Sequence, residues 1–414
     1  MELTRLVLHQ FRNYAELNQE FSAGLNLLVG GNAQGKSNLL EAIYLLATTK
    51  SMRGARDAEL IAWDARAAVV TGWVRRDRQP DTELAVVLSR EEGKTLAVHG
   101  ARVPRTGDFV GQLQVVGFCA ADLEIVRGEP ARRRRFLDLE ISQISPSYCH
   151  ALARYRRIVE QRAQLLKSLA RRPVAGSEAL LATWTEQLIQ YGAPIVARRA
   201  RYLADLGERA SAIHHELTEG REHLTLGYRC SFPIAGADSP EAIALAFREA
   251  LARVADDERR RGLCLVGPHR DDVAFLFDGH DARPYGSQGQ QRTIALSLRL
   301  AELELMEEVA GEPPVCLLDD VLSDLDDRRR AQLFERVGER CQTLVTCARL
   351  GALPEAVRRR GVVYEVEAGR IRRCEPALPP GRGLSLLGSQ GPHGPGGGRE
   401  QELLPGRHAG PNAR

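Results

Sequence analysis

One stretch of the sequence decides its fold class, Gly30-Gly31-Asn32-Ala33-Gln34-Gly35-Lys36-Ser37. The stretch fits the pattern G-x-x-x-x-G-K-[ST], in which glycines let backbone N–H groups converge on phosphate oxygens. An apolar run at 25–29 precedes it, and residues 37–47 carry apolar side chains at helical spacing. A strand, a loop and a helix in this order predict a phosphate-binding loop, because the helix N-terminus adds its positive dipole end. The alternative is a glycine-rich turn without a ligand.

Lysine is scarce in this chain, which makes Lys36 stand out. Of 57 basic residues only four are lysines, at Lys36, Lys50, Lys94 and Lys167. A compact ammonium on a flexible stem makes different contacts from a planar guanidinium. In a loop of this pattern the lysine reaches the β- and γ-phosphates and the serine hydroxyl binds Mg²⁺. Lys36 is therefore a predicted catalytic residue and Ser37 a predicted metal ligand, whereas the other three lysines have no explanation beyond chance.

An apolar strand that ends in two acids is the second signal, Val315-Cys316-Leu317-Leu318-Asp319-Asp320. Asp319 is placed to hold Mg²⁺. Asp320 is placed to orient or deprotonate an attacking water, which makes it a candidate catalytic residue. The alternative is a strand that ends in a solvated acidic turn. Together with the upstream loop, the pattern indicates a site for ATP and Mg²⁺.

The third signal is a polar loop at the head of an apolar helix, Gly286-Ser287-Gln288-Gly289-Gln290-Gln291-Arg292. Such a loop at a helix N-terminus binds anions. It is most useful on the face of the nucleotide opposite the phosphate-binding loop, supplied by another subunit. Ser287, Gln288, Gly289 and Gln290 are therefore candidate nucleotide-binding residues. The alternative is a plain helix cap formed by Ser287, and the sequence leaves both interpretations open.

Six segments carry a family resemblance: Phe11-Arg12-Asn13-Tyr14, Ser37-Asn38-Leu39-Leu40-Glu41-Ala42-Ile43-Tyr44-Leu45-Leu46, Phe136-Leu137-Asp138, Gly267-Pro268-His269-Arg270-Asp271-Asp272, residues 286–293, and residues 317–326. In order and spacing they resemble the RecF family of recombination-repair ATPases, which is related to SMC-type and ABC-type heads. The resemblance covers about residues 1–373 and leaves out the C-terminal tail.

This resemblance implies an ATP-driven dimer clamp that binds DNA at single-strand gaps and duplex junctions. ATP would bind at the Gly30–Ser37 loop, and Ser287 and Gln288 of one subunit would face the γ-phosphate held by the other. RecF-like proteins act with RecO and RecR to help RecA filaments form, and so support repair of stalled replication and the SOS response. The resemblance also implies a weak DNA-stimulated ATPase that acts as a switch.

Four departures from the family pattern bear on hydrolysis. Gly31 and Ala33 stand where Glu and Gly are expected, and the run Cys119-Ala120-Ala121 replaces Ser-Pro-Glu. Cys347-Ala348-Arg349 follows the strand at 343–346, without the histidine that serves as a γ-phosphate switch. Asp320 stands where many ABC heads use Glu. The short helical arm and the missing switch histidine favour slow hydrolysis that mainly resets DNA binding.

The predicted fold class is α/β, a P-loop ABC/SMC-type ATPase head with mixed sheets, flanking helices and a compact helical insert. Residues 286–371 alternate helix and strand, which predicts a parallel sheet with crossover helices. Apolar spacing at 148–169 and 180–217 predicts a helical hairpin in which Pro194 kinks or restarts the second helix. The predicted divisions are 1–140 (head lobe with the P-loop), 141–260 (helical insert), 261–375 (second lobe) and 376–414 (disordered tail).

A formal net charge of +3 excludes a uniformly basic coat, so DNA contact must come from local patches. The densest cluster is Arg132-Arg133-Arg134-Arg135, the candidate DNA-binding residues. Phosphate contacts there would make binding salt-sensitive, but arginine runs are common in this composition and mostly solvated. The absence of an 18-residue apolar run predicts no membrane span, and eight cysteines without a C-x-x-C pair suggest a reduced, cytoplasmic protein.

Three other functional classes fit parts of the sequence. A nucleotide kinase would need a lid and an acceptor site, the ATPase head of an Old-type nuclease would need a C-terminal metal domain, and a transporter ATPase subunit would need membrane partners. Phosphate transfer to a small metabolite would overturn the DNA-binding interpretation. The His269-Arg270-Asp271-Asp272 run either orders an interface near the Ser287 loop or forms a hydrogen-bonded turn.

Overall fold

The strand that precedes the glycine-rich loop lies inside a six-stranded sheet of order β15-β14-β3-β13-β12-β8. The computed structural model describes residues 1–374, apart from 78, 172–175, 235–238, 322–324 and 339. The strands of this sheet are β3 (Leu25–Val29), β8 (Val115–Cys119), β12 (Val315–Asp319), β13 (Thr343–Cys347), β14 (Val362–Glu367) and β15 (Arg370–Arg373). All neighbours except β14 and β15 pair in parallel. The predicted parallel sheet is confirmed, and it also takes in two strands from the N-terminal third.

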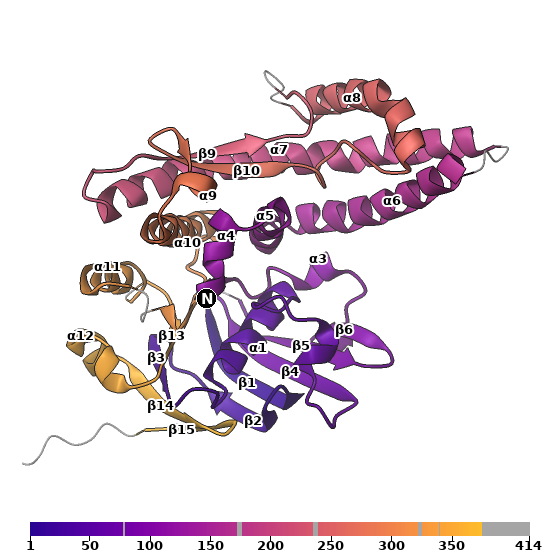
Figure 1. The fold of residues 1–414 in the computed structure, drawn as a ribbon. Coiled ribbons are helices and arrows are strands. Elements are labelled where there is room, and N and C mark those ends of the chain that lie inside the picture. The colour runs from indigo at the N-terminus through magenta and orange to yellow at the C-terminus, as the bar shows by residue number, and fades with distance from the viewer. Residues whose placement is uncertain (78, 172–175, 235–238, 322–324, 339, 375–414) are drawn as a thin grey trace, which may run out of the picture. The chain divides into compact units, whose positions relative to one another are not determined.

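Helices cover both faces of this sheet, which explains why β12 and β13 are buried at every residue. The helix after the loop is α1 (Lys36–Thr48), and α11 (Asp327–Val337) and α12 (Glu355–Arg360) make the later crossovers. Short helices complete the set: α2 (Asp57–Leu60), α3 (Thr106–Phe109), η1 (Ala120–Asp122), α4 (Leu123–Arg127), α9 (Ala282–Tyr285) and η3 (Leu350–Ala352). Figure 1 shows β3, β13 and β14 beside α11 and α12.

A second six-stranded sheet is antiparallel, with order β2-β1-β4-β5-β6-β7. Its strands are β1 (Glu2–Phe11), β2 (Tyr14–Glu20), β4 (Ala67–Arg75), β5 (Thr82–Ser89), β6 (Gly93–Val98) and β7 (Ala101–Arg102). Burial alternates along β4 and β5, as in a sheet with one covered face. Helix α1 contacts strands of both large sheets, so a single helix joins the glycine-rich loop to two layers.

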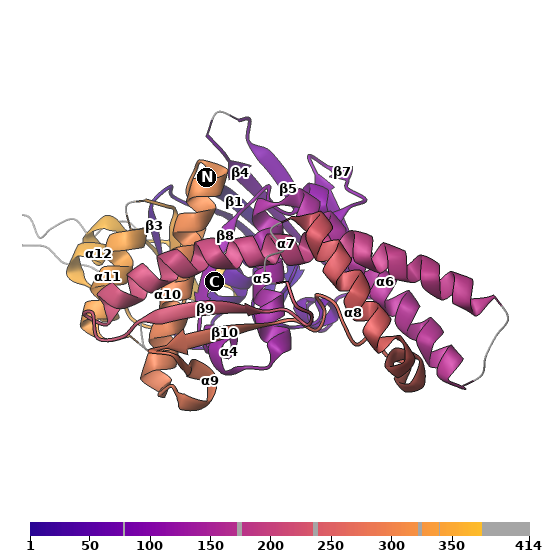
Figure 2. The ribbon, with the colours of Figure 1, turned by 90° about the horizontal axis from the view of Figure 1, so that it is seen from above.

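Long helices form the middle of the chain: α5 (Pro130–Ile144), α6 (Pro146–Arg171), α7 (Ser177–Leu217) and α8 (Pro240–Arg261). The predicted hairpin is present, because α6 packs along α7 (Figures 1 and 2). Pro194 does not restart the second helix, since α7 runs unbroken through it for 41 residues. Ile195 and Val196, directly after the proline, are fully buried. Their packing offsets the roughly 3 kcal/mol by which an interior proline disfavours a helix.

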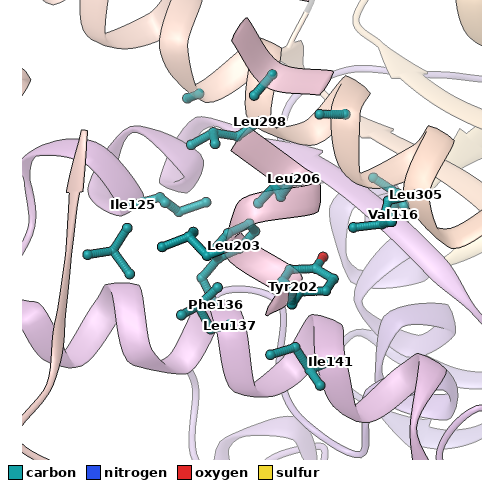
Figure 3. Packing of buried hydrophobic residues seen from close by; sticks show 14 of the residues in the cluster. Val116, Ile125, Phe136, Leu137, Ile141, Tyr202, Leu203, Leu206, Leu298 and Leu305 are labelled. Atoms are coloured by element: carbon teal, nitrogen blue, oxygen red, sulfur yellow. The ribbon is translucent and has the colours of Figure 1, made fainter. Parts of the chain in front are cut away.

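A three-stranded antiparallel sheet, β9 (Leu224–Arg229), β10 (Asp272–Phe277) and β11 (His280–Asp281), lies beside α7. Helix α10 (Gln288–Ala310) begins at the polar loop and packs against α7, α5 and β8. Figure 3 shows this junction, where Leu298 and Leu305 of α10 share one core with Leu203 and Leu206 of α7. Helix α10 is therefore packed into the protein and is not a surface appendage.

The described residues fall within one contact unit, Met1–Glu375. The predicted boundary at 140/141 falls inside α5, and the boundary at 260/261 falls at the end of α8. The predicted tail, 376–414, lies outside the described residues. No helix in the described part of the chain is long and apolar enough to cross a membrane.

Candidate functional site

The glycine-rich loop wraps around the side chain of Lys36. The Lys36 ammonium donates hydrogen bonds to the carbonyl oxygens of Gly30 and Gly31, both at 2.7 Å. Within the described chain, the backbone N–H groups of residues 31–35 make no hydrogen bond to a protein acceptor. An ammonium that bends over successive unsatisfied N–H groups is a fitting cradle for phosphate oxygens.

Neighbouring segments fix the shape of the loop. Tyr14 donates from its hydroxyl to the carbonyl oxygen of Gly35 at 3.0 Å, and Asn13 donates from Nδ2 to that of Gln34 at 3.1 Å. The Gln34 carbonyl also accepts a hydrogen bond from the backbone of Gly369 at 3.0 Å. At Gly35 the φ of 115° requires glycine, and a Cβ there would lie 2.6 Å from the Asn13 amide. The Asn13-Tyr14 pair thus supports the loop directly.

Ala33 has a left-handed backbone, with φ of 62°. A residue with a Cβ is disfavoured in this region by roughly 1–2 kcal/mol. Glycine is expected at this position in the family that the sequence resembles, and the structure shows the physical effect of the alanine. The loop keeps the left-handed turn and accommodates the alanine with strain.

The loop and the acidic strand meet in one place. Ser37 donates from its hydroxyl to Asp319 Oδ1 at 2.7 Å. Thr346, at the end of β13, donates to the same Asp319 oxygen at 3.0 Å and accepts from the backbone N–H of Asp320 at 2.9 Å. A hydroxyl next to a carboxylate is the kind of oxygen ligand set that Mg²⁺ prefers. Thr346 was missed in the sequence, because a threonine at the end of a buried strand gives no signal of its own.

Asp320 and Cys347 occupy the ends of neighbouring strands. Asp320 is exposed and has a φ of 52°, a left-handed conformation that Asp and Asn tolerate better than most residues. Cys347 stands in the region where a switch histidine was expected, and burial raises the pKa of its thiol to about 11. The thiol is therefore protonated at neutral pH and cannot replace a titrating histidine. Residues 322–324 of the predicted acidic segment lie outside the described residues.

The polar loop forms the N-terminus of α10. Ser287 accepts from the backbone N–H of Gln290 at 3.2 Å, and the Gln290 side chain accepts from the Ser287 backbone at 2.9 Å. This capping box is the alternative that the sequence left open. Ser287, Gln288 and Gly289 are nevertheless exposed, so the helix N-terminus faces solvent. None of the hydrogen bonds of 287–290 in the described chain reaches the P-loop of the same molecule.

The polar contacts that hold α10 in place include those of Gln290 and Arg299. Gln290 donates to Glu222 at 2.9 Å, at the base of β9. Deeper in the helix, the buried Arg299 donates to Asp122 at 2.7 Å and to Glu302 at 2.7 Å. Asp122 follows β8, the strand paired with β12. The head of α10 is thus connected through Arg299 to the sheet that carries Asp319.

The four clustered arginines do not share one surface. Arg133 is buried and donates to both oxygens of Asp272, at 2.6 and 3.0 Å. Arg134 and Arg135 are half-buried and donate to the backbone carbonyls of Asp271 and Ser51. Only Arg132 is exposed. The buried Arg133 has no surface to offer to DNA, so the cluster provides at most three cations.

The His269-Arg270-Asp271-Asp272 run forms a hydrogen-bonded turn. His269 contacts the Tyr155 hydroxyl through Nδ1 at 2.7 Å and the Cys264 carbonyl through Nε2 at 3.3 Å. Burial lowers the pKa of His269 to about 4, so the ring is neutral and its two nitrogens suit these partners. Asp271 is buried and accepts from the backbone of Ser231 at 2.7 Å. These contacts favour the structural interpretation of the run.

Known proteins match almost the whole described chain. The family described as RecF/RecN/SMC N terminal domain matches residues 2–371. Two curated relatives are both named "DNA replication and repair protein RecF". The relative from Halalkalibacterium halodurans is 42% identical over 373 residues, which cover 90% of this chain and 100% of the relative. The relative from Synechocystis sp. is 44% identical over 383 residues, which cover 91% and 99%.

Solved structures show the same relationship. One described as the "recombination mediator protein RecF-ATPrS in RecFOR pathway" has a TM-score of 0.83 and 34% identity, over 90% of this chain and 98% of that chain. An Smc head bound to the C-winged helix domain of ScpA has a TM-score of 0.50 and 15% identity, over 91% and 98%, and shares only the fold. The predicted fold class, an ABC/SMC-type ATPase head, is confirmed.

Proposed function

This chain belongs to the RecF/RecN/SMC N-terminal domain family, and from that membership we propose that it is an ATP-dependent DNA-binding protein of recombinational repair and replication restart. The observation that carries the proposal is the hydrogen bond between Ser37 and Asp319. It brings the glycine-rich loop and the acidic strand end into one site. P-loop ATPases hold a nucleotide and its metal with this pair of elements.

The residues of this site fit ATP and Mg²⁺. The N–H groups of residues 31–35 and the Lys36 ammonium would hold the phosphates, and Ser37 and Asp319 would hold the metal. When bound, the ion neutralises phosphate charge and orients the phosphate oxygens. Lys36 leaves its two carbonyl partners to reach the phosphates, which the flexible stem of a lysine allows.

Hydrolysis by this site is slow. Asp320 orients or deprotonates the attacking water, and its backbone is fixed by the hydrogen bond to Thr346. The neutral Cys347 thiol supplies no charge to a γ-phosphate. We expect a turnover well below a median enzyme rate of about 10 s⁻¹, so that ATP gates DNA binding and its hydrolysis resets the protein.

Two subunits close on two nucleotides. The exposed N-terminus of α10, with Ser287 to Gln290, makes no hydrogen bond to its own P-loop in the described chain and can serve the nucleotide of a partner subunit. Its N–H groups and positive dipole end suit a γ-phosphate. Arg299 links this helix to Asp122 beyond β8, so closure at the interface acts on the sheet that carries Asp319.

The closed dimer binds DNA, and local clusters of basic side chains contact the DNA phosphates. The net charge of +3 requires such patches, and Arg132 is the exposed member of the densest cluster. RecF relatives in the RecFOR pathway support RecO and RecR as partners. RecA loading and the SOS response follow from the same assignment.

The testing experiment measures binding of a fluorescent gapped duplex, with and without a non-hydrolysable ATP analogue and Mg²⁺. We expect the analogue to tighten binding at least tenfold and to retain the gapped duplex through a salt challenge that releases it from the nucleotide-free protein. Nucleotide-independent affinity would contradict the proposal. Transfer of phosphate from ATP to a small metabolite would replace it with a kinase.

A further inference from the structure

A pocket of about 400 Å³ opens at the far end of α1 from Lys36, where three parts of the protein meet. The segment after α1 contributes Lys50, strand β6 and the edge strand β7 contribute Lys94 and Arg102, and α6 contributes Arg156. Asp57 is the one acidic residue in the lining. Figure 1 shows β6 and α3 below α6 in this region, and α3 contacts both of them.

The positive charges of this pocket are incompletely neutralised. Lys94 already binds Asp57 at 2.8 Å and the Thr49 carbonyl at 2.6 Å, and Arg156 binds Asp138 at 3.0 Å. Within the described chain, the charged groups of Lys50 and Arg102 have no hydrogen-bond or ion-pair partner. Burial, and then the like charge of Lys94, lowers the pKa of Lys50. An anion in the pocket would relieve this repulsion.

The choice of lysine at two positions of the lining adds to this argument. The chain has four lysines among 57 basic residues, and two of the four face the same pocket. An ammonium is a compact charge whose three donors rotate freely, which suits oxygens that are not held in one plane. Thr49, Thr95 and Thr106 also line the pocket, and hydroxyls together with cations are donors that bind phosphate oxygens.

We propose that this pocket binds a phosphomonoester, carried either by a free mononucleotide or by the end of a DNA strand. A phosphomonoester carries about two negative charges at neutral pH, which matches the two unneutralised cations, Lys50 and Arg102. A phosphodiester inside a strand carries one charge and must leave the pocket on both sides. No aromatic side chain lines the pocket, so the base is not held by stacking and its identity is not read.

This inference goes beyond the proposed function, because it requires neither ATP nor a dimer. Its first test is calorimetric titration of the full chain with thymidine 5′-monophosphate and with thymidine, in the absence of ATP. We expect saturable binding of the phosphate form only. Lys50→Gln and Arg102→Gln should each weaken it about tenfold, since each removes one cation of the pocket lining that has no ion-pair partner in the described chain.

Lys167→Gln is the matched control, because Lys167 is an exposed lysine of α6 outside the pocket. It should change the affinity less than twofold. Lys36→Arg separates the pocket from the P-loop, and it should leave thymidine monophosphate binding intact. A loss with Lys36→Arg, or an equal loss with Lys167→Gln, would overturn the proposal.

A second arm decides the source of the phosphate. Duplexes with and without terminal phosphates are compared for binding to the wild-type chain and to Lys50→Gln. A preference for phosphorylated ends that Lys50→Gln removes assigns the pocket to strand ends, whether or not the mononucleotide binds. Binding of the mononucleotide alone assigns it to a free ligand. No preference in either arm would overturn the proposal, whatever the outcome for ATP-dependent DNA binding.

Discussion

Ser37 and Asp319 are hydrogen-bonded at 2.7 Å, although 282 positions separate them in the chain. Ser37 lies in α1, after the loop that follows β3, and Asp319 ends β12; these two strands are not neighbours, because β13 lies between them. All three strands are parallel, so their carboxyl ends reach the same edge. Thr346, at the end of the middle strand, donates to Asp319 and holds the backbone of Asp320. The candidate site is therefore a property of one sheet edge.

Asp320→Asn should separate ATP binding from hydrolysis. Asparagine tolerates the left-handed φ of 52° at this position, so the fold is kept while the proton acceptor is lost. We expect hydrolysis to fall by about 10²-fold or more, with ATP affinity changed by less than threefold. Phosphate release and nucleotide titration measure the two effects. Asp327→Asn, at a 98% exposed side chain, is the control, and equal losses in both variants would argue against a catalytic Asp320.

Ala33→Gly should stabilise the protein. The φ of 62° at Ala33 disfavours a residue with a Cβ, although glycine gains freedom in the unfolded chain. We expect the free energy of unfolding to rise by up to about 1 kcal/mol, measured by denaturant titration. Gly31→Ala is the comparison, because a Cβ there has ordinary contact with Gln34 at 3.7 Å and should be nearly neutral. A destabilised Ala33→Gly variant would mean that the loop is not strained.

Substitution of Arg133 should lower stability, whereas substitution of its neighbour Arg132 should affect DNA binding. Arg133→Met leaves Asp272 without its buried partner and should destabilise the protein by about 3–5 kcal/mol. Arg132→Ala changes an exposed side chain and should alter stability by less than about 0.5 kcal/mol. If Arg132 contacts a phosphate, its removal weakens DNA binding and lowers the salt slope by about one. Chemical denaturation and salt-dependent DNA titration test both claims, and the reverse pattern would contradict them.

The free energy of unfolding should decrease as pH decreases through a window that His269 sets. Its pKa in the folded protein is about 4, below the unfolded value near 6.5. Between these pH values the histidine is protonated in the unfolded chain and neutral in the folded protein. The group therefore destabilises the protein progressively as pH falls from about 6.5 to 4, by at most about 3 kcal/mol. His269→Gln should flatten the pH dependence of unfolding in this window, and an unchanged slope would contradict the assignment.

The sequence predicted those elements whose signal is local. Apolar runs and glycines correctly placed the strand, loop and helix around Lys36. They also placed strands β12 and β13. Strand β2 was not predicted, because Tyr14–Glu20 is mostly polar and its register is set by pairing with β1. Pro194 does not interrupt α7 for a similar reason, since the packing of Ile195 and Val196 outweighs the low helix propensity of proline.

Contacts between distant side chains could not be predicted from the sequence. Arg132 to Arg135 look alike as a run, yet Asp272, 139 positions beyond Arg133, decides that one of them is buried. Lys50 and Lys94 appeared to be chance lysines until the fold placed them in one pocket. Thr346 and Glu222 likewise gain their roles only through partners that a different strand or helix supplies.

A nucleotide held by the P-loop should close two subunits, and sedimentation velocity measures this closure. Wild type and Lys36→Arg are each run with and without a non-hydrolysable ATP analogue and Mg²⁺. Arginine keeps the charge but not the compact ammonium that reaches Gly30 and Gly31. We expect that only the wild type with the analogue sediments as a dimer. A wild type that stays monomeric with the analogue, or a Lys36→Arg variant that dimerises equally well, would contradict it.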